Sequence, residues 1–223
     1  MEAGFAAMWD RRRRPPRVLT SWADAAWAKG RRRYLTFLIR VNEAAVIAKA
    51  LDVQRRLAAF PCIDPLPIHY FHITVKGVGF PAPSKQHADD VVATDVDRII
   101  DHATPLLKAF SPFEAHLTRL NYFSEVICLE VHDANHIRAM NNALLAVPEI
   151  PRMANDYPRF LPHFSVAQFR TADGFDGVLD FLETHRSTSL GSITLNVVDL
   201  VVAHLPRIGR YPWLETVWEF PLG

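Results

Sequence analysis

Apolar residues gather in short runs along the chain, and loops containing proline separate these runs. The first run extends from Tyr34 to Val41 and is rich in β-branched and aromatic residues, a composition typical of a β-strand. By the same criterion we expect strands at residues 68–80, 113–123, 126–132, 192–205 and 213–222.

Four intervening segments place apolar residues three or four positions apart, which is the spacing of one helix face. Each segment opens with a residue that can cap a helix. The predicted starts are Asn42, Thr94, Asp133 and Asp173. Pro61 should end the first helix, and Pro105 should kink the second. Helices that alternate with strands in this way predict an α+β fold.

The order strand, helix, strand occurs twice in the chain. The two first strands begin at Tyr34 and Val126, which are 92 positions apart, and the later strands contain His72 and His163, which are 91 positions apart. This repetition predicts a bilobal fold of two strand-helix-strand units related by a pseudo-twofold axis. We expect antiparallel sheets that form a central cleft, with the histidine strands meeting in the middle.

Composition limits the class of protein. The chain has 223 residues, of which 49% are hydrophobic and 22% charged, as is usual for a globular domain. It contains no apolar run of 18 residues, so we expect no membrane partner. Cys62 and Cys128 lie in apolar contexts, which favours buried free thiols in a reducing compartment. We therefore expect a cytoplasmic protein. We also expect a monomer.

Positive charge is concentrated at the N-terminus. Residues 1–33 hold nine Lys/Arg and three acids, whereas the remainder holds 16 basic and 21 acidic residues. We interpret residues 1–33 as a basic extension before a single domain at residues 34–222. Such an arm can contact nucleic acid or another polyanion, and the alternative is a solvated, partly ordered extension. Residues 22–28 could form a helical turn or two on the body of the protein.

The candidate chemistry lies in the two histidine strands. Each strand has a hydroxyl residue two positions after its histidine, and residues two apart on a strand point the same way. The two pairs are His72 with Thr74 and His163 with Ser165. Two imidazoles can divide the roles of general acid and general base near neutral pH, and the hydroxyls can hold oxygens of a phosphate ester.

Strand parity extends this prediction to neighbouring residues. Lys76 lies four positions after His72, so on a regular strand it points to the same face and could offset negative charge that builds on the phosphate. Arg170 has the opposite parity to His163, which places it outside the cleft. Tyr70 has the parity of His72 and could line the cleft.

Other aromatic residues and histidines complete the set of candidates. Tyr122 and Tyr211 could stack on a nucleobase, with packing in the core or at the rim as the alternative. The remaining histidines have no metal-ligand spacing, and His69 lies three residues from His72, on the opposite face of a strand. A zinc hydrolase is therefore the least favoured class.

The two motifs, His72-Ile73-Thr74-Val75 and His163-Phe164-Ser165-Val166, resemble those of the 2H phosphoesterase superfamily, in particular its 2′-5′ RNA ligase-like branch. The resemblance covers about residues 33–222 and extends to the contexts Leu161-Pro162 and Gly209-Arg210-Tyr211. It implies that His72 and His163 act as general base and general acid, that Thr74 and Ser165 bind phosphate, and that no metal or other cofactor is needed. One departure concerns the basic residue that often follows the second motif: here Ala167, Gln168 and Phe169 precede Arg170.

The expected function is a metal-independent phosphodiesterase that hydrolyses 2′,3′-cyclic phosphates of RNA ends or nucleotides to 2′-phosphomonoesters. One alternative is an enzyme of 2′-5′ linkages, either a 2′-5′ oligoadenylate phosphodiesterase or an RNA ligase. Another is a nucleotide- or RNA-binding module without turnover. In each case the expected partner is an RNA terminus or nucleotide with a cyclic or 2′-5′ phosphodiester.

Overall fold

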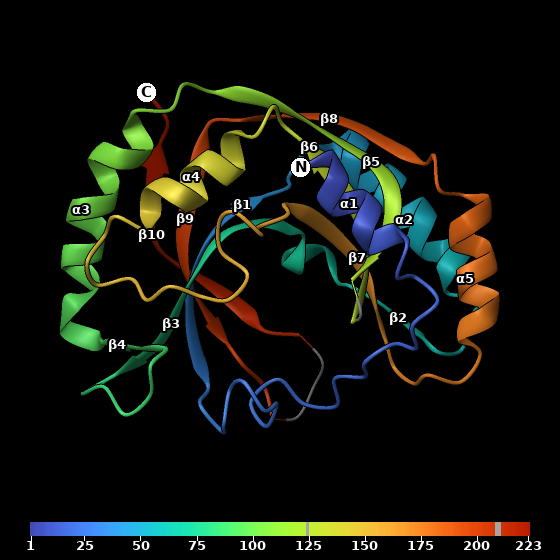
Figure 1. Cartoon of the computed structure of the whole chain (residues 1–223), viewed down its shortest axis with the longest axis horizontal. Helices are drawn as coiled ribbons and strands as arrows, with labels where there is room; N and C mark the ends of the chain where they lie inside the picture. Colours follow the sequence, from blue (N-terminus) through green and yellow to red (C-terminus); the bar gives the residue numbers. More distant parts are fainter. Residues whose placement is uncertain (124, 208–210) are drawn as a thin grey trace.

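The computed structural model describes residues 1–123, 125–207 and 211–223. The described residues form a ten-stranded sheet and five α-helices (Figure 1). The strands are β1 (Arg33–Arg40), β2 (Ile63–Pro65), β3 (His72–Ala82), β4 (Asp90–Val92), β5 (Phe113–Phe123), β6 (Val126–His132), β7 (His163–Phe169), β8 (Ser189–Leu195), β9 (Val197–His204) and β10 (Trp213–Pro221). The helices are α1 (Glu2–Trp9), α2 (Ala44–Leu57), α3 (Val96–Lys108), α4 (His136–Leu144) and α5 (Phe175–Thr184). Gly209 and Arg210, which belong to one of the predicted family contexts, lie outside the described residues.

The order of the strands confirms the predicted duplication. The sheet runs β10-β9-β1-β3-β7-β6-β5-β8, so the two histidine strands, β3 and β7, are neighbours at its centre. β1 and β6 flank this pair as equivalent strands, each being the first strand of its unit. Neighbouring strands along this order pair antiparallel. The α+β fold with two related halves is thus confirmed.

Helices α2 and α4 are exchanged between the two halves: each packs on the half of the sheet that it does not follow in the sequence. α2 follows β1 of the first half but packs on β7 and β8 of the second, and α4 follows β6 of the second half but packs on β3 of the first. In Figure 1, α3 and α4 cover the left part of the sheet, and α2 and α5 cover the right part. The stripe on α2 (Val46, Ala50, Val53 and Leu57) is buried, as its spacing predicts. The main core lies between the sheet and these helices.

Two predicted strands have different boundaries. The strand expected at residues 68–80 begins at His72, because Ile68–Tyr70 form a 3-10 turn that the Phe71 N–H closes on the Ile68 carbonyl at 3.0 Å. The run expected at residues 192–205 is two strands that separate at Asn196, and β8 and β9 then lie in opposite halves of the sheet.

Helix starts follow the predicted caps only in part. α4 begins at His136 after the N-cap Asn135, so the start predicted at Asp133 is two residues too early, although the Asp133 carboxylate accepts the Ile137 N–H of the first turn at 2.6 Å. α3 begins at Val96 without a side-chain cap, so the predicted capping role of Thr94 is wrong. Pro105 lies within α3, which continues to Lys108. None of the helices in the described part of the chain is both long and apolar enough to cross a membrane.

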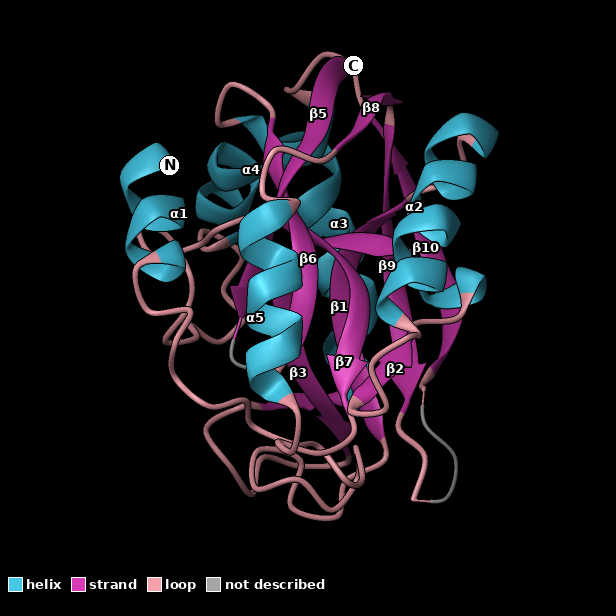
Figure 2. Cartoon of the chain, turned by 90° about the vertical axis from the view of Figure 1, so that its right-hand side faces the viewer, coloured by secondary structure: helices cyan, strands magenta, loops and turns pink. Residues whose placement is uncertain are grey.

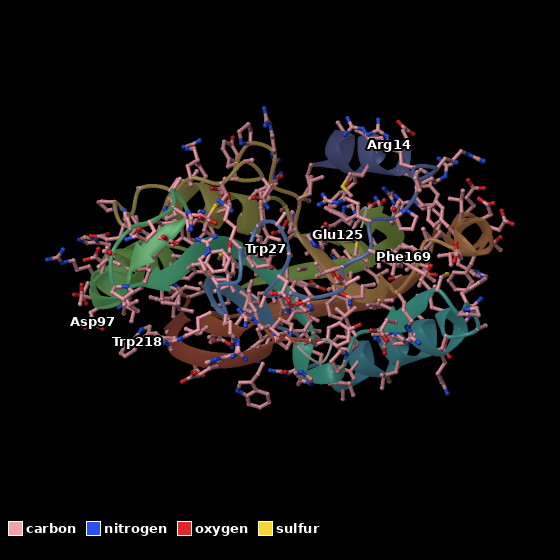
Figure 3. The ribbon with its side chains drawn as sticks, turned by 90° about the horizontal axis from the view of Figure 1, so that it is seen from below. Arg14, Trp27, Asp97, Glu125, Phe169 and Trp218 are labelled. Atoms are coloured by element: carbon pink, nitrogen blue, oxygen red, sulfur yellow. The ribbon has the colours of Figure 1, made fainter. Side chains whose placement is uncertain are left out.

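Residues 1–32, here called the arm, lie on the sheet face that the other helices leave uncovered. α1 packs on β5, where Phe5 is buried and its carbonyl accepts the Asn121 side-chain N–H at 3.2 Å. Ala23 and Ala28 are buried against Leu38 in a second, smaller core. Figures 1 and 2 show the arm running from α1 along the lower rim of the sheet to β1. In the view from below, Arg14 lies beside α1 and Trp27 nearer the centre (Figure 3).

Much of the arm's positive charge is paired with the body. Arg12 and Arg13 both reach Glu183 on α5, at 2.8 and 3.2 Å. Arg31 contacts Asp89 at 2.8 Å and lies over the Phe80 ring at 3.6 Å from its centroid. These contacts tie both ends of the arm to the folded domain.

Candidate active site

Pairing of β3 with β7 brings the two histidine motifs together at the centre of the sheet. Ile73 lies opposite Phe164 in this antiparallel pair, and both side chains are buried in the core. One step along either strand therefore sets each histidine opposite the hydroxyl residue of the other motif, on the other face of the sheet. The four side chains that share this face are His72, Thr74, His163 and Ser165, and all four are partly exposed.

The two imidazoles are oriented in the same way. His72 Nδ1 lies 2.6 Å from the Tyr70 carbonyl oxygen, and His163 Nδ1 lies 2.9 Å from the Leu161 carbonyl oxygen. A carbonyl only accepts, so Nδ1 carries the hydrogen in both rings. Nε2 is then the atom of each ring that can take up or release a proton.

Each histidine strand contains a β-bulge one residue after its hydroxyl residue. Val75 in β3 and Val166 in β7 have no partner on the neighbouring strand, as the register shifts show. Buried amide side chains hold the carbonyls of both bulges. Asn141 on α4 donates to the Val75 carbonyl at 2.8 Å, and Gln54 on α2 donates to the Val166 carbonyl at 2.6 Å. The exchanged helices thereby fix the backbone directly beside the motifs.

The bulge in β3 changes the position of Lys76. Strand parity predicts that Lys76 shares the face of Thr74, but the extra residue Val75 turns it to the core side, so this prediction is wrong. Lys76 is fully buried, and its Nζ lies 3.0 Å from Asp156 and 3.1 Å from the Pro151 carbonyl. Lys76 thus anchors the loop that leads to the second motif and does not reach the imidazoles.

The bulge in β7 has the converse effect. Beyond Val166, the alternation of side chains between the two faces is shifted by one residue. Gln168, which strict alternation from His163 would place on the opposite face, therefore lies on the face of Ser165. Arg170, which parity also excluded, lines the same cavity as Gln168, and its guanidinium lies 3.1 Å from Asp64.

The charges beside the two histidines differ. Arg40 on β1 lies directly opposite His72, whereas Glu130 on β6 lies directly opposite His163. Arg40 contacts Asp199 at 3.0 Å, and the fully buried Glu130 is paired with Arg186. The pseudo-twofold axis thus relates a cation beside the first imidazole to an anion beside the second.

This asymmetry bears on the protonation of the imidazoles. Burial, the charge of a protonated His163 and the charge of Arg40 lower the pKa of His72 to about 4. Burial also lowers the pKa of His163, against the hydrogen bond to the Leu161 carbonyl. Because each imidazole disfavours the charge of its neighbour, the pair holds one proton more readily than two.

Aromatic rings surround the pair. The Phe123 ring stacks on His163 with centroids 4.2 Å apart, and the Tyr70 ring meets His72 edge-on at 4.8 Å. Tyr211 lies 5.8 Å from Tyr70, centroid to centroid. Tyr70 therefore lies beside His72, and Tyr211 is in contact with Tyr70. Sequence reasoning missed Phe123, because no local pattern shows that the β5–β6 hairpin reaches the second histidine.

Tyr122 lies elsewhere. Its side chain is only 4% exposed, and its ring packs against Phe169 and Phe175 at 5.5 and 5.4 Å between centroids. Its hydroxyl donates to the Arg14 carbonyl of the arm at 3.4 Å, and burial raises its pKa to about 12. The core packing considered as the alternative for Tyr122 is what the structure shows.

Clusters of metal-ligating side chains are absent from the described ranges. No group of three or more His, Cys, Asp or Glu side chains that could hold a metal ion occurs within residues 1–123, 125–207 and 211–223.

Known families and structures provide an independent comparison. The family model of the 2′-5′ RNA ligase superfamily matches residues 40–205. No curated protein matches the chain by sequence. Among solved structures, TT0787 of Thermus thermophilus is 17% identical with a TM-score of 0.63, and the match covers 85% of this chain and 97% of that one. LigT of E. coli complexed with 3′-AMP is 14% identical with a TM-score of 0.59, and the match covers 86% and 98%. At these identities the structural matches show a shared fold.

Proposed function

Because the chain belongs to the 2′-5′ RNA ligase superfamily, we propose that it is a metal-independent phosphodiesterase that hydrolyses 2′,3′-cyclic phosphates of RNA ends or nucleotides. The single observation that carries the proposal is the block of two imidazoles and two hydroxyls on one face of β3 and β7. LigT, which shares the fold, has been crystallised with 3′-AMP, ATP, NADP+ and phosphate, and these ligands favour a nucleotide as the substrate.

The geometry supports an in-line hydrolysis. Thr74 and Ser165 hold the non-bridging phosphate oxygens. One imidazole Nε2 takes a proton from water as its oxygen bonds to phosphorus, and the other gives a proton to the 3′ oxygen as the P–O3′ bond breaks. The products are a 2′-phosphomonoester and a free 3′ hydroxyl. One proton is taken up and one released, so exchange with solvent resets the pair.

The charges beside the histidines support an assignment of roles. We assign the base to His72, because Arg40 and the protonated His163 keep it neutral. We assign the acid to His163, because burial lowers its pKa without the added effect of a neighbouring cation and the Leu161 carbonyl opposes that lowering. A neutral base and a protonated acid are the states that the reaction consumes.

The dependence of kcat/KM on pH tests this assignment. Activity requires neutral His72 and protonated His163, so kcat/KM should be bell-shaped, with the acid limb near pH 4 and the maximum below about pH 6.5. The profile of kcat should lie at higher pH, since a bound phosphate anion favours both imidazolium forms. Rates between about pH 3.5 and about pH 9 in buffers of constant ionic strength measure both profiles. A kcat/KM that keeps rising above about pH 7 would refute the assignment.

Product analysis tests the proposed reaction against its alternatives. Adenosine 2′,3′-cyclic phosphate should be converted to adenosine 2′-monophosphate in the presence of EDTA, while 2′-5′ and 3′-5′ diadenosine phosphates stay intact. Cleavage of the 2′-5′ dinucleotide alone would establish the 2′-5′ linkage enzyme instead. Tight nucleotide binding without turnover of either substrate would establish the binding module.

A further inference from the structure

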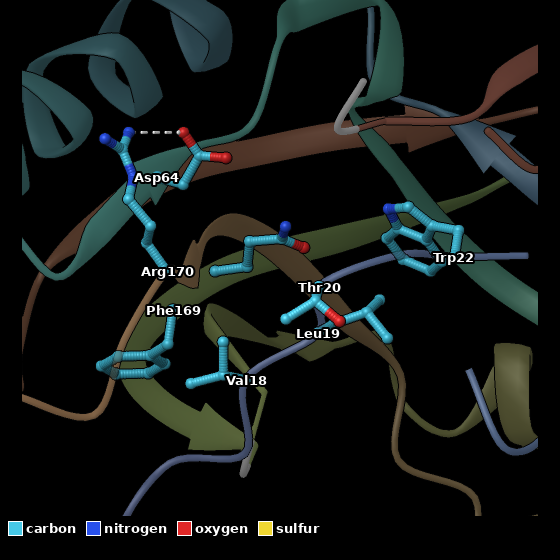
Figure 4. Close-up of a pocket in the computed structure, with 8 residues that line it drawn as sticks. Val18, Leu19, Thr20, Trp22, Asp64, Phe169 and Arg170 are labelled. Carbon is cyan, nitrogen blue, oxygen red and sulfur yellow. Dashed lines mark hydrogen bonds and ion pairs between the residues drawn. The ribbon is translucent and has the colours of Figure 1, made fainter. Parts of the chain in front are cut away.

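The arm and the end of β7 enclose a cavity of about 220 Å³ beside the central strands (Figure 4). One wall is the arm segment 18–22, which includes Trp22. The opposite wall is formed by Gln168, Phe169 and Arg170 after the β7 bulge, together with Asp64 on β2. The family model matches residues 40–205, so the arm wall lies outside the matched range.

The cavity is close to the histidines along two routes. The Trp22 ring lies 6.0 Å from the Tyr70 ring, and the Tyr70 ring lies 4.8 Å from His72. On β7, Gln168 lies three residues beyond Ser165, which is about 10 Å at the rise of a strand. A nucleotide whose phosphate contacts Ser165 can therefore place its base in the cavity.

Gln168 indicates what the cavity binds. The residue is only 7% exposed and lines the cavity, and its side-chain amide makes no hydrogen bond to another residue in the described parts of the chain. The Gln168 amide atoms are not among the buried side-chain atoms that lack a partner in the described residues, so they stay accessible within the cavity and are available to a ligand. The amide offers a donor and an acceptor side by side, which is the complement of an adenine edge.

The remaining lining is suited to a flat aromatic ring. Trp22 supplies an aromatic surface. Arg170 supplies a planar guanidinium, which its ion pair with Asp64 at 3.1 Å holds in place. Aromatic and guanidinium planes are the surfaces on which proteins stack unpaired bases.

We propose that this cavity binds the nucleobase of the substrate, that Gln168 recognises adenine by a paired hydrogen bond, and that the arm residue Trp22 provides a stacking surface. This inference rests on the proposed function, since it places the base of the nucleotide whose phosphate lies at the histidines. The arm then serves as part of the substrate site.

Calorimetric binding by the full chain in EDTA tests the inference. The probes are adenosine 2′-monophosphate, guanosine 2′-monophosphate and inorganic phosphate. Wild type should bind the adenosine nucleotide at least about fivefold more tightly than the guanosine nucleotide, because guanine presents two acceptors where adenine presents a donor and an acceptor. Gln168→Leu should abolish this preference and lower the affinity for the adenosine nucleotide about tenfold, while the affinity for inorganic phosphate stays unchanged.

A matched control is Gln86→Leu, since Gln86 is an exposed glutamine between β3 and β4 that does not line the cavity, and this variant should keep wild-type affinities. Trp22→Leu should lower the affinity for both nucleotides. Equal affinities of wild type and Gln168→Leu for the adenosine nucleotide, with both proteins folded by circular dichroism, would overturn the inference. Base-dependent binding that Gln168→Leu removes, without turnover of any cyclic phosphate, would support the cavity and refute the proposed function.

Discussion

Replacement of His72 or His163 by alanine should lower kcat/KM for adenosine 2′,3′-cyclic phosphate by a factor of about 10² to 10⁴. Each histidine occupies the same position in its half of the sheet, and each directs Nε2 away from a backbone carbonyl that holds Nδ1. Loss of either ring removes one of the two proton transfers. The double variant should be little slower than the slower single variant, because each single variant already lacks one of the two proton transfers that act together.

The matched control for this prediction is His69→Ala. His69 lies three residues before His72, is exposed, and contacts Trp213 at the edge of the molecule. Its variant should keep wild-type kinetics. Rates measured in EDTA with purified, folded variants decide the matter. Wild-type turnover by both His72→Ala and His163→Ala would refute the two-histidine mechanism.

Lys76→Met should destabilise the fold by about 3–5 kcal/mol, because it leaves Asp156 buried without its cation. For a chain of this size, a loss of that order lowers Tm by on the order of 10 °C. Lys76→Met with Asp156→Asn should recover part of the loss, since Asn keeps an acceptor and removes the unpaired charge. Thermal unfolding followed by circular dichroism measures each value.

Lys85→Met is the control, because Lys85 is exposed and surface substitutions change stability by about 0.5 kcal/mol or less. The same variants distinguish the two roles considered for Lys76. A Lys76→Met protein with the wild-type Tm and a greatly reduced kcat would mean that the lysine acts on the phosphate. A lowered Tm, with kcat retained well below the unfolding transition, is the outcome expected from the ion pair.

The sequence predicts which motif side chains meet at the centre of the sheet, and it predicts the position of their neighbours less well. The His72 and His163 motifs were recognisable because alternation within a short strand needs no tertiary information. The alternation of faces fails one residue further on, at the bulges of Val75 and Val166, whose carbonyls accept hydrogen bonds from Asn141 and Gln54 on the exchanged helices. Valine gives no local sign of a bulge, in contrast to glycine or proline.

The arm was less predictable for a related reason. α1 has no apolar stripe, and the contacts that hold it are tertiary: Phe5 packs at 5.4 Å from the His132 ring, and Glu2 lies 2.7 Å from His132 Nδ1. Tyr122 was likewise ambiguous, because an aromatic residue on a strand can face either a ligand or the core. Phe123 reaches His163 from β5, which is not a neighbour of β7 in the sheet, and residue spacing does not encode a contact of this kind.

The most direct test of the central claim is a crystal structure of the full chain with adenosine 2′-monophosphate. We expect the phosphate group within hydrogen-bond distance of both Nε2 atoms of His72 and His163 and of the hydroxyls of Thr74 and Ser165. A phosphate held at any other place on the molecule, with these four side chains contacting only water, would contradict the account.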